Sequence, residues 1–322
     1  MVDKGGRWEG QSPTELVARS LVMQMAIGEA FDCLDRAGVP AIVLKGPAIA
    51  SWLYQPDEVR SSVDVDLLVP PERFNDAEQV LAQLGYHHRL PGTAACEIAA
   101  NARELLAETG ICIDLHRYLI GLPDPARSWE LLSHQTTALP LASGAQVTVF
   151  DVPARAMHLA LHAAQDGPQD FKALADLERG LAQVLVGTWR QAAALAEQLG
   201  ATAAFAAGLG LCPAGRTLAA ELGLPDLAGV ELALRVRSTP HESLFFEQLS
   251  VTPGIATKLK LVGRKLWPTR AYLASGVTDA LASRWAVAAA RVRRLDSLAH
   301  RAPPALKAWR ETRKEFRGGG RR

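Results

Sequence analysis

The chain has 322 residues, of which 48% are apolar and 21% charged, and its formal net charge at pH 7 is +1. This length exceeds one typical domain, and the composition is that of a soluble globular protein. The start, MVDKGGRWEGQS, has no apolar signal core, and no uninterrupted run of about 18 apolar residues occurs, so we expect neither secretion nor a membrane span.

The four cysteines are scattered along the chain, and no two of them form a CxxC pair: Cys33, Cys96, Cys112 and Cys212. We expect reduced, mostly buried thiols in a cytoplasmic protein, and neither a disulfide framework nor a zinc site.

The charges are unevenly distributed. Residues 255–322 contain 17 Lys and Arg against four Asp and Glu, a net charge of +13, whereas the preceding residues carry −12. Such asymmetry is informative about partners and not about fold. The basic segment is therefore expected either to bind an anionic partner or to be attracted by the acidic part of its own chain.

The N-terminal part predicts two helices and a strand. Residues 13–37 carry apolar side chains at helical spacing, and residues 41–44 form an apolar strand. A Lys45-Gly46 turn follows, then a short helix over residues 47–54.

The next strand carries two aspartates, Asp64 and Asp66, separated by one residue. Because side chains alternate along a strand, both carboxylates lie on one face, where they repel each other and are costly to bury unpaired. A divalent cation resolves both problems, and hard cations such as magnesium prefer carboxylate oxygens. The alternative is a pair of solvated carboxylates at an exposed strand edge.

The turn before this strand favours the metal site. Gly46 permits a tight turn and close backbone approach, and Pro47 suits the first position of a helix. A helix N-terminus beside Lys45 is suited to phosphate oxygens. A phosphate site next to a metal-binding Asp-x-Asp strand indicates phosphoryl or nucleotidyl transfer.

Between residues 70 and 110 the pattern predicts a helix over residues 74–84, a short strand over residues 86–90 and a helix over residues 93–109.

Residues 111–119 then form a strand on which Asp114 and His116 share one face. Asp114 completes a three-carboxylate site if this strand neighbours the Asp-x-Asp strand; otherwise it caps backbone N–H groups at a strand end. His116 orients Asp114 or touches substrate, or it is a hydrogen-bonded structural histidine.

Residues 146–150 predict one last strand, and from residue 151 to about 222 the pattern is helical, with breaks at Gly167-Pro168, Gly187 and Gly200. We therefore place a domain boundary near residue 151.

One helical face in this part carries His158, His162 and Asp166 at intervals of four residues. We interpret this face as lining a cleft that holds substrate; a half-buried histidine face without a ligand is the alternative. Asp176, on the following helix, is a candidate partner for one of the histidines.

The C-terminal part contains a linker with short helices over residues 223–254 and a helical segment over residues 257–316. We expect interruptions of that segment at Pro268, Gly276 and Pro303-Pro304. No nucleic-acid-binding signature accompanies its arginines. The Gly-rich end, residues 318–322, is expected to be disordered.

Several of these motifs together resemble the uncharacterised nucleotidyltransferase family of the DNA polymerase beta superfamily. The residues that carry the resemblance are Leu44-Lys45-Gly46, Leu53-Tyr54, Arg60, Asp64-Val65-Asp66-Leu67-Leu68-Val69 and Ile113-Asp114-Leu115-His116, with a looser likeness near His162, Asp176 and Leu266-Trp267-Pro268. The superfamily binds metal-NTP with a strand, a glycine turn, a helix and an Asp-x-Asp strand, and takes a third carboxylate from a later strand. One departure is Pro47, where the superfamily usually has serine or glycine, so a hydroxyl and a backbone N–H are missing.

The resemblance implies the fold and the reaction. We expect an α/β (α+β) nucleotidyltransferase domain with a mixed sheet over residues 1–150 and an all-helical domain over residues 151–322. The reaction transfers a nucleoside monophosphate from an NTP, by default ATP, to an unidentified acceptor and releases pyrophosphate. The acceptor is a small molecule, a peptide or protein, or RNA.

The resemblance also assigns roles to residues. Asp64, Asp66 and Asp114 would hold two Mg²⁺ ions, and Asp114 would also accept the acceptor's proton. Lys45 and Gly46 would bind the β- and γ-phosphates, and Arg60 would bind phosphate and stabilise charge on the leaving group. From its position in the loop four residues before Asp64, Arg60 could instead pair with Asp64 or be a solvated loop arginine. His116, His158 and His162 are candidates for substrate contact.

Two other functions stay open. The chain is either a non-catalytic nucleotide-binding or scaffolding protein of this fold, for which Pro47 is the best support, or a nucleic-acid-directed transferase that uses its basic C-terminal segment.

Overall fold

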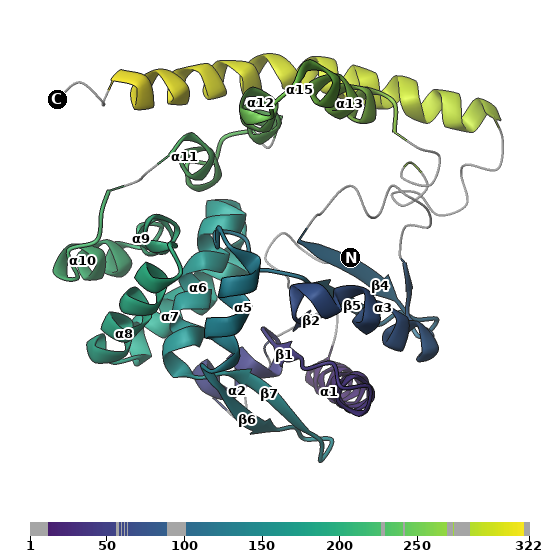
Figure 1. The fold of residues 1–322 in the computed structure, drawn as a ribbon, viewed down its shortest axis with the longest axis vertical. Coiled ribbons are helices and arrows are strands. Elements are labelled where there is room, and N and C mark those ends of the chain that lie inside the picture. Colours follow the sequence, from purple (N-terminus) through teal and green to yellow (C-terminus); the bar gives the residue numbers. More distant parts are fainter. Residues whose placement is uncertain are drawn as a thin grey trace. The chain divides into compact units, whose positions relative to one another are not determined.

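A computed structural model describes residues 12–55, 58, 60, 62, 64–88, 101–226, 229–240, 242–268, 273 and 284–318 (Figure 1). The described residues up to Asp226 form one compact unit, and those from Gly229 onward form a second.

The first unit is built on a mixed seven-stranded sheet with the order β3-β4-β5-β2-β1-β7-β6. Its strands are β1 (Ile42–Val43), β2 (Asp64–Leu68), β3 (His87–His88), β4 (Ala102–Leu106), β5 (Cys112–His116), β6 (Thr136–Pro140) and β7 (Gln146–Phe150). The strand β1 pairs antiparallel with β2 and parallel with β7, and β2 pairs parallel with β5. The predicted mixed sheet, followed by a helical C-terminal region, is thereby confirmed.

The segment before β5 differs from the prediction. The helix expected over residues 93–109 is wrong for its described part, since residues 102–106 form β4, which pairs antiparallel with both β3 and β5. The alanine and glutamate content favours a helix locally, but Ala102 and Leu105 are buried within the sheet. Sheet pairing has overridden local propensity here. Residues 93–100 lie outside the described residues.

The two faces of the sheet are covered by different helices. The helices α1 (Pro13–Arg36) and α3 (Phe74–Gln83) cover one face, where their apolar side chains pack on Val43, Val65 and Ile113 (Figure 1). On the opposite face, Ile42, Leu68 and Phe150 pack against the helices that follow β7. Since side chains alternate along β2, Asp64 and Asp66 lie on this second face.

The helices that follow β7 belong to the same unit as the sheet. They are α6 (Val152–Asp166), α7 (Phe171–Gln183), α8 (Val186–Gln198), α9 (Thr202–Leu209) and α10 (Pro213–Glu221). Asp151 and Asp170 cap α6 and α7 by accepting hydrogen bonds from backbone N–H groups of their first turns. The change from strands to helices thus falls where the pattern placed it, while the domain boundary at residue 151 stays a prediction.

Shorter elements complete this unit. They are α2 (Pro47–Leu53), α5 (Pro125–Ser133), η1 (Pro71–Arg73) and η2 (Gly167–Gln169). Neither α5 nor β6 was predicted from the sequence.

The described part of the second unit is helical and contains α11 (Val230–Val236), α12 (Glu242–Val251), α13 (Ile255–Leu266) and α15 (Arg284–Gly318). The interruption expected at Pro303-Pro304 is wrong, because α15 continues through both prolines. Ala305 directly after them is fully buried, and its carbonyl accepts a hydrogen bond from Ser243 of α12. Packing on α12 therefore outweighs the local cost of proline, about 3 kcal/mol. Among the described helices, none combines the length and the apolar character needed to cross a bilayer.

Candidate active site

The parallel pairing of β2 with β5 places Asp66 directly opposite Asp114. His116, two residues further along β5, lies on the same face, and its Nε2 is 3.1 Å from Asp66 Oδ1 and 3.2 Å from Asp114 Oδ2. Within the described part of the chain, these three side chains form a group whose ligand atoms lie close enough together to hold a metal ion. The sheet thus brings together two of the three predicted carboxylates and a histidine.

Asp66 is the buried centre of this group, with only 3% of its surface exposed. Lys45 reaches it from the turn after β1, with its Nζ 2.8 Å from Asp66 Oδ1. Burial alone would raise the pKa of Asp66, but Lys45 and His116 outweigh burial and hold it well below its usual range. Asp66 is therefore ionised, and two cationic groups fix its position.

His116 is correspondingly protonated near neutral pH. Burial lowers its pKa, but its hydrogen bonds to Asp114 and Asp66 outweigh burial and raise the pKa to about 9. Burial also lowers the pKa of Lys45, but the negative charge of Asp66 outweighs burial, so the pKa of Lys45 is raised overall. Lys45 and His116 thus lie against the carboxylates of Asp66 and Asp114 as their cationic partners.

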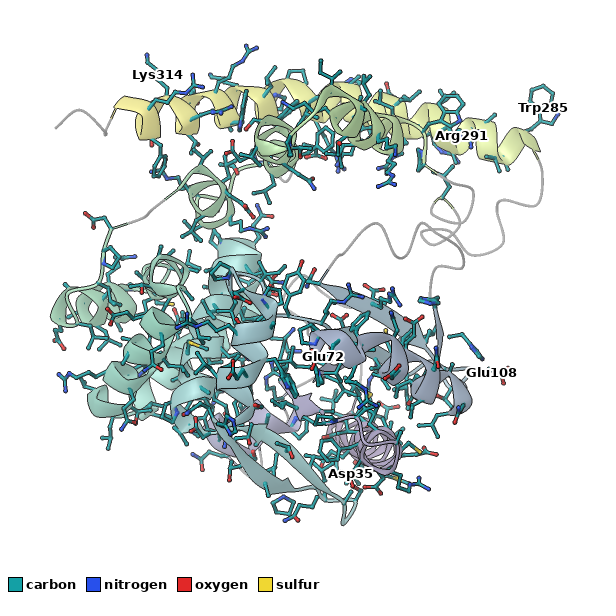
Figure 2. The ribbon with its side chains drawn as sticks, viewed as in Figure 1. Asp35, Glu72, Glu108, Trp285, Arg291 and Lys314 are labelled. Atoms are coloured by element: carbon teal, nitrogen blue, oxygen red, sulfur yellow. The ribbon has the colours of Figure 1, made fainter. Side chains whose placement is uncertain are left out.

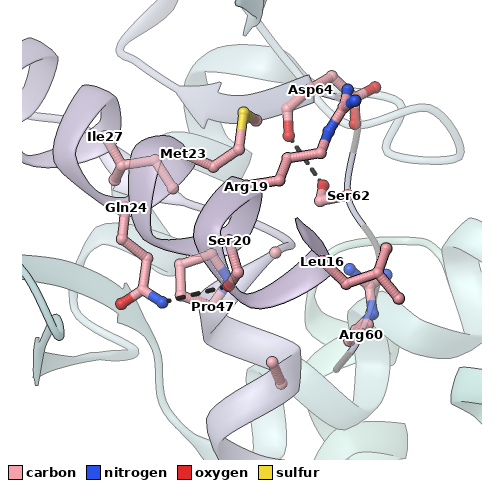
Figure 3. Close-up of a pocket in the computed structure, with 12 residues that line it drawn as sticks. Leu16, Arg19, Ser20, Met23, Gln24, Ile27, Pro47, Arg60, Ser62 and Asp64 are labelled. Carbon is pink, nitrogen blue, oxygen red and sulfur yellow. Dashed lines mark hydrogen bonds between the residues drawn. The ribbon is translucent and has the colours of Figure 1, made fainter. Parts of the chain in front are cut away.

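Asp64 lies outside this group. Burial, followed by repulsion from Asp66, raises its pKa. It lines a cavity of about 50 Å³ together with Gly46, Pro47 and Arg60. Figure 3 shows the Arg19 side chain extending from α1 toward Asp64 at this cavity. Asp64 is therefore available to a ligand in the cavity from the same strand that carries Asp66.

The glycine turn has the predicted form. Gly46 adopts φ +58° and ψ −116°, which side chains with a Cβ strongly disfavour, and Pro47 is the first residue of α2. The helix α2 has seven residues, and the Ala48 N–H already donates to the Lys45 carbonyl. The short helix itself thus has few N–H groups left for an anion, and binding of phosphate would depend on cationic side chains.

Arg60 forms an ion pair that the sequence did not indicate. It contacts Asp176 of α7 through Nε and Nη2, at distances of 3.0 and 2.6 Å to the carboxylate, and Tyr54 donates to the same carboxylate at 2.7 Å. We predicted Asp64 or phosphate as the partner of Arg60, and a histidine as the partner of Asp176. Both expected side-chain pairings are wrong, because α7 folds over the loop that carries Arg60.

One part of the Arg60 guanidinium is still free to bind a ligand. The side chain is almost completely buried, and its Nη1 has no hydrogen-bond partner among the described residues. The residue also lines the cavity that contains Asp64 and Gly46 (Figure 3). A buried N–H group without a partner costs free energy, so an oxygen-rich ligand would satisfy it.

The predicted histidine face of α6 lies near the same centre. His162 Nε2 is 3.0 Å from Asp166 Oδ2, and the ring of His158 packs on those of Phe150 and His162. Burial, then the neighbouring His162 and Lys45, lowers the pKa of His158 well below its usual value. His158 is therefore a neutral, buried ring near Lys45, whereas His162 is partly exposed.

Sequence reasoning missed Lys172, which lies in the first turn of α7. It is half-buried, and it forms no ion pair within the described chain. Burial, followed by repulsion from Arg60, lowers its pKa, while Asp64 and Asp66 are close enough to oppose that change. No signal in the sequence connects this lysine with strands more than a hundred residues earlier.

The chain belongs to the uncharacterised nucleotidyltransferase family, whose profile matches residues 11–214. The matched span contains every site residue described above, and the predicted resemblance is confirmed. The chain matches no curated protein significantly.

Two solved structures are distantly similar to this chain. The antibiotic-resistance factor ANT(2'')-Ia shares 15% identity over 56% of this chain and 94% of its own, with a TM-score of 0.40. An antigenic nucleotidyltransferase-like protein from Paracoccidioides brasiliensis shares 14% identity over 64% of this chain and 94% of its own, with a TM-score of 0.38. Neither likeness is close enough to transfer the role of an individual residue.

Proposed function

We propose that this protein transfers a nucleoside monophosphate from an NTP, by default ATP, to an acceptor and releases pyrophosphate. The observation that carries the proposal is the pairing of Asp66 with Asp114 on neighbouring parallel strands, beside Lys45 and Arg60. Paired carboxylates next to several cations suit a reaction between an anionic triphosphate and a divalent metal.

The residues present fit magnesium. Asp66 and Asp114 offer carboxylate oxygens at one place, and Asp64 offers a third carboxylate from the same strand face. His116 Nε2 is within hydrogen-bonding distance of both carboxylates, so it would orient them as a donor, and Asp64 would be the third carboxylate ligand. Bound Mg²⁺, two ions in the full site, would neutralise triphosphate charge and lower the pKa of the acceptor hydroxyl.

Cations of the chain would bind the triphosphate. Lys45 is held on Asp66 by the 2.8 Å ion pair, and it would turn toward phosphate oxygens once a metal takes over the charge of Asp66. Arg60 would donate from its free Nη1, and Lys172 would supply a further charge from the first turn of α7. With Gly46, whose backbone permits close approach, these groups form the proposed phosphate site.

The proton of the acceptor would go to Asp114. The side chain of Asp114 is 26% exposed, whereas that of Asp66 is 1% exposed. Asp114 is thus the carboxylate of the pair that an acceptor hydroxyl can reach. His158 and His162, on the face of α6 near Lys45, are our candidates for contact with the substrate.

A non-catalytic nucleotide-binding protein is the second candidate. Pro47 removes an N–H group and a hydroxyl from the usual phosphate-binding turn, and Lys45 is already paired with Asp66. Such a protein would bind metal-NTP without transferring any part of it.

Nucleotide binding can be tested through Lys172. We expect titration calorimetry to detect ATP binding with magnesium and none with EDTA. Lys172→Met should weaken magnesium-ATP binding about tenfold, because a half-buried cation near the triphosphate is lost while no ion pair is broken.

The matched control is Lys307→Met, which removes an exposed lysine of α15. Binding of none of the four NTPs in the presence of magnesium would contradict the proposal. Equal affinities of the two lysine variants for magnesium-ATP would show that Lys172 does not contribute to nucleotide binding.

A further inference from the structure

The helix α13 in the second unit has an apolar stripe that no described residue covers. Successive side chains on a helix are rotated by roughly 100°, so Ile255, Leu259 and Leu266 fall on one narrow face. They are 78%, 66% and 43% exposed, and α13 has no buried residue. A stripe of large aliphatic side chains in water marks a surface that another apolar phase covers.

Cations flank this stripe on both sides. Lys258 and Lys265 lie along one edge and Lys260 lies toward the other, while Arg264 lies on the back of the helix; residues 255–266 contain no acidic side chain. The edge with Lys265 faces the unit itself, since Lys265 packs over the ring of Phe245. The stripe and the opposite edge are therefore exposed together.

Exposed tryptophans occur beside α13 and at the start of α15. Trp267 directly follows α13 and is 62% exposed, and Arg291 of α15 stacks on its ring. Trp285, at the start of α15, is 85% exposed and projects away from the described helices (Figure 2). Val292, seven residues later on the same face of α15, is also exposed.

We propose that α13, together with Trp267 at its C-terminal end, docks on the surface of an anionic phospholipid membrane. A helix with an aliphatic stripe, flanking lysines and a tryptophan at its end is the pattern of a helix that lies in the membrane interface. The stripe enters the acyl boundary, and the cations remain at the level of the anionic headgroups.

Two other occupants fit less well. A nucleic acid would engage the cations and stack on tryptophan, but it would leave the aliphatic stripe in water. A second copy of the chain would bring two α13 helices together, each with four cations and no acid, and like charges would repel. An anionic lipid surface would bury the aliphatic side chains of the stripe and would also pair the cations with its headgroups.

Flotation of the full-length protein with lipid vesicles tests this proposal. We expect binding to vesicles of phosphatidylcholine with phosphatidylglycerol and little binding to phosphatidylcholine alone. The double variant Ile255→Ser with Leu259→Ser should lose affinity by about tenfold or more, because two exposed aliphatic side chains no longer insert. Lys260→Gln should weaken binding about fivefold.

The matched controls lie in the first unit. Leu185→Ser removes a leucine that is 79% exposed, and Arg190→Gln removes an exposed cation of α8, and neither should change vesicle binding. Circular dichroism establishes that all variants fold.

Three results would overturn the proposal: no binding to anionic vesicles, equal binding of the Ile255/Leu259 variant and the wild type, or a stripe-dependent dimer without lipid in sedimentation velocity. Vesicle binding requires no nucleotide, so this test stands apart from the proposed transfer reaction.

Discussion

Replacing Asp66 by asparagine is expected to abolish magnesium-dependent nucleotide binding and all transfer activity. Asp66 is the carboxylate shared by Lys45, His116 and the proposed metal, and the asparagine amide is a much weaker ligand for a hard cation. The variant should also be less stable by about 1–3 kcal/mol, because Lys45 and His116 lose their buried charge partner.

This prediction has a readout that does not depend on activity. The pKa of His116, followed by NMR titration, should fall from about 9 toward its usual value in Asp66→Asn, since one of the two carboxylates that raise it has become neutral. Asp35→Asn, a change at the exposed surface of α1 (Figure 2), is the control and should leave binding, stability and this pKa unchanged. Full magnesium-dependent activity of Asp66→Asn would rule out the proposed metal site.

Replacing Asp114 by alanine should separate binding from chemistry. We expect magnesium-ATP to bind within a few-fold of wild type, because Asp64, Asp66, Lys45 and Arg60 remain. The transfer rate should fall by roughly a hundredfold or more, because the acceptor hydroxyl loses the group that takes its proton.

Nucleotide titration beside single-turnover transfer distinguishes the possible roles of Asp114. A parallel loss of affinity and rate would make it a ground-state ligand. An unchanged rate would show that Asp114 is structural, and the three-carboxylate site would then not exist.

The sequence predicted the local parts of this site well. Alternation along two strands was enough to place Asp64 and Asp66 on one face, and Asp114 and His116 on one face, because side-chain direction in a strand is set by neighbours along the chain. Which strands become neighbours depends on contacts far apart in the sequence. The register that places Asp66 opposite Asp114 could therefore be read only from the structure.

Side-chain pairs between residues far apart in the sequence could not be predicted from local sequence patterns. Arg60 and Asp176 are 116 residues apart, and neither residue has a local feature that specifies the other. Lys172 was missed for the same reason. The strand β4 was mistaken for a helix because its composition favours a helix, whereas its pairing with β3 and β5 decides its conformation.

The proline pair of α15 shows the same limit. Local rules predict a break at Pro303-Pro304, yet the helix continues because α12 holds the segment that follows. Tertiary contacts thus decided the outcome wherever a local rule and the fold disagreed.

The most direct test of the proposed reaction uses ATP labelled in two positions. The protein is incubated with magnesium and cell extract, once with ATP radiolabelled at the α-phosphate and once at the γ-phosphate, with Asp66→Asn as the blank. Nucleotidyl transfer predicts that the α-label becomes attached to an acceptor while the γ-label leaves as pyrophosphate, and that neither occurs with Asp66→Asn. Transfer of the γ-label to the acceptor, or attachment of the α-label by Asp66→Asn as well, would contradict the proposal.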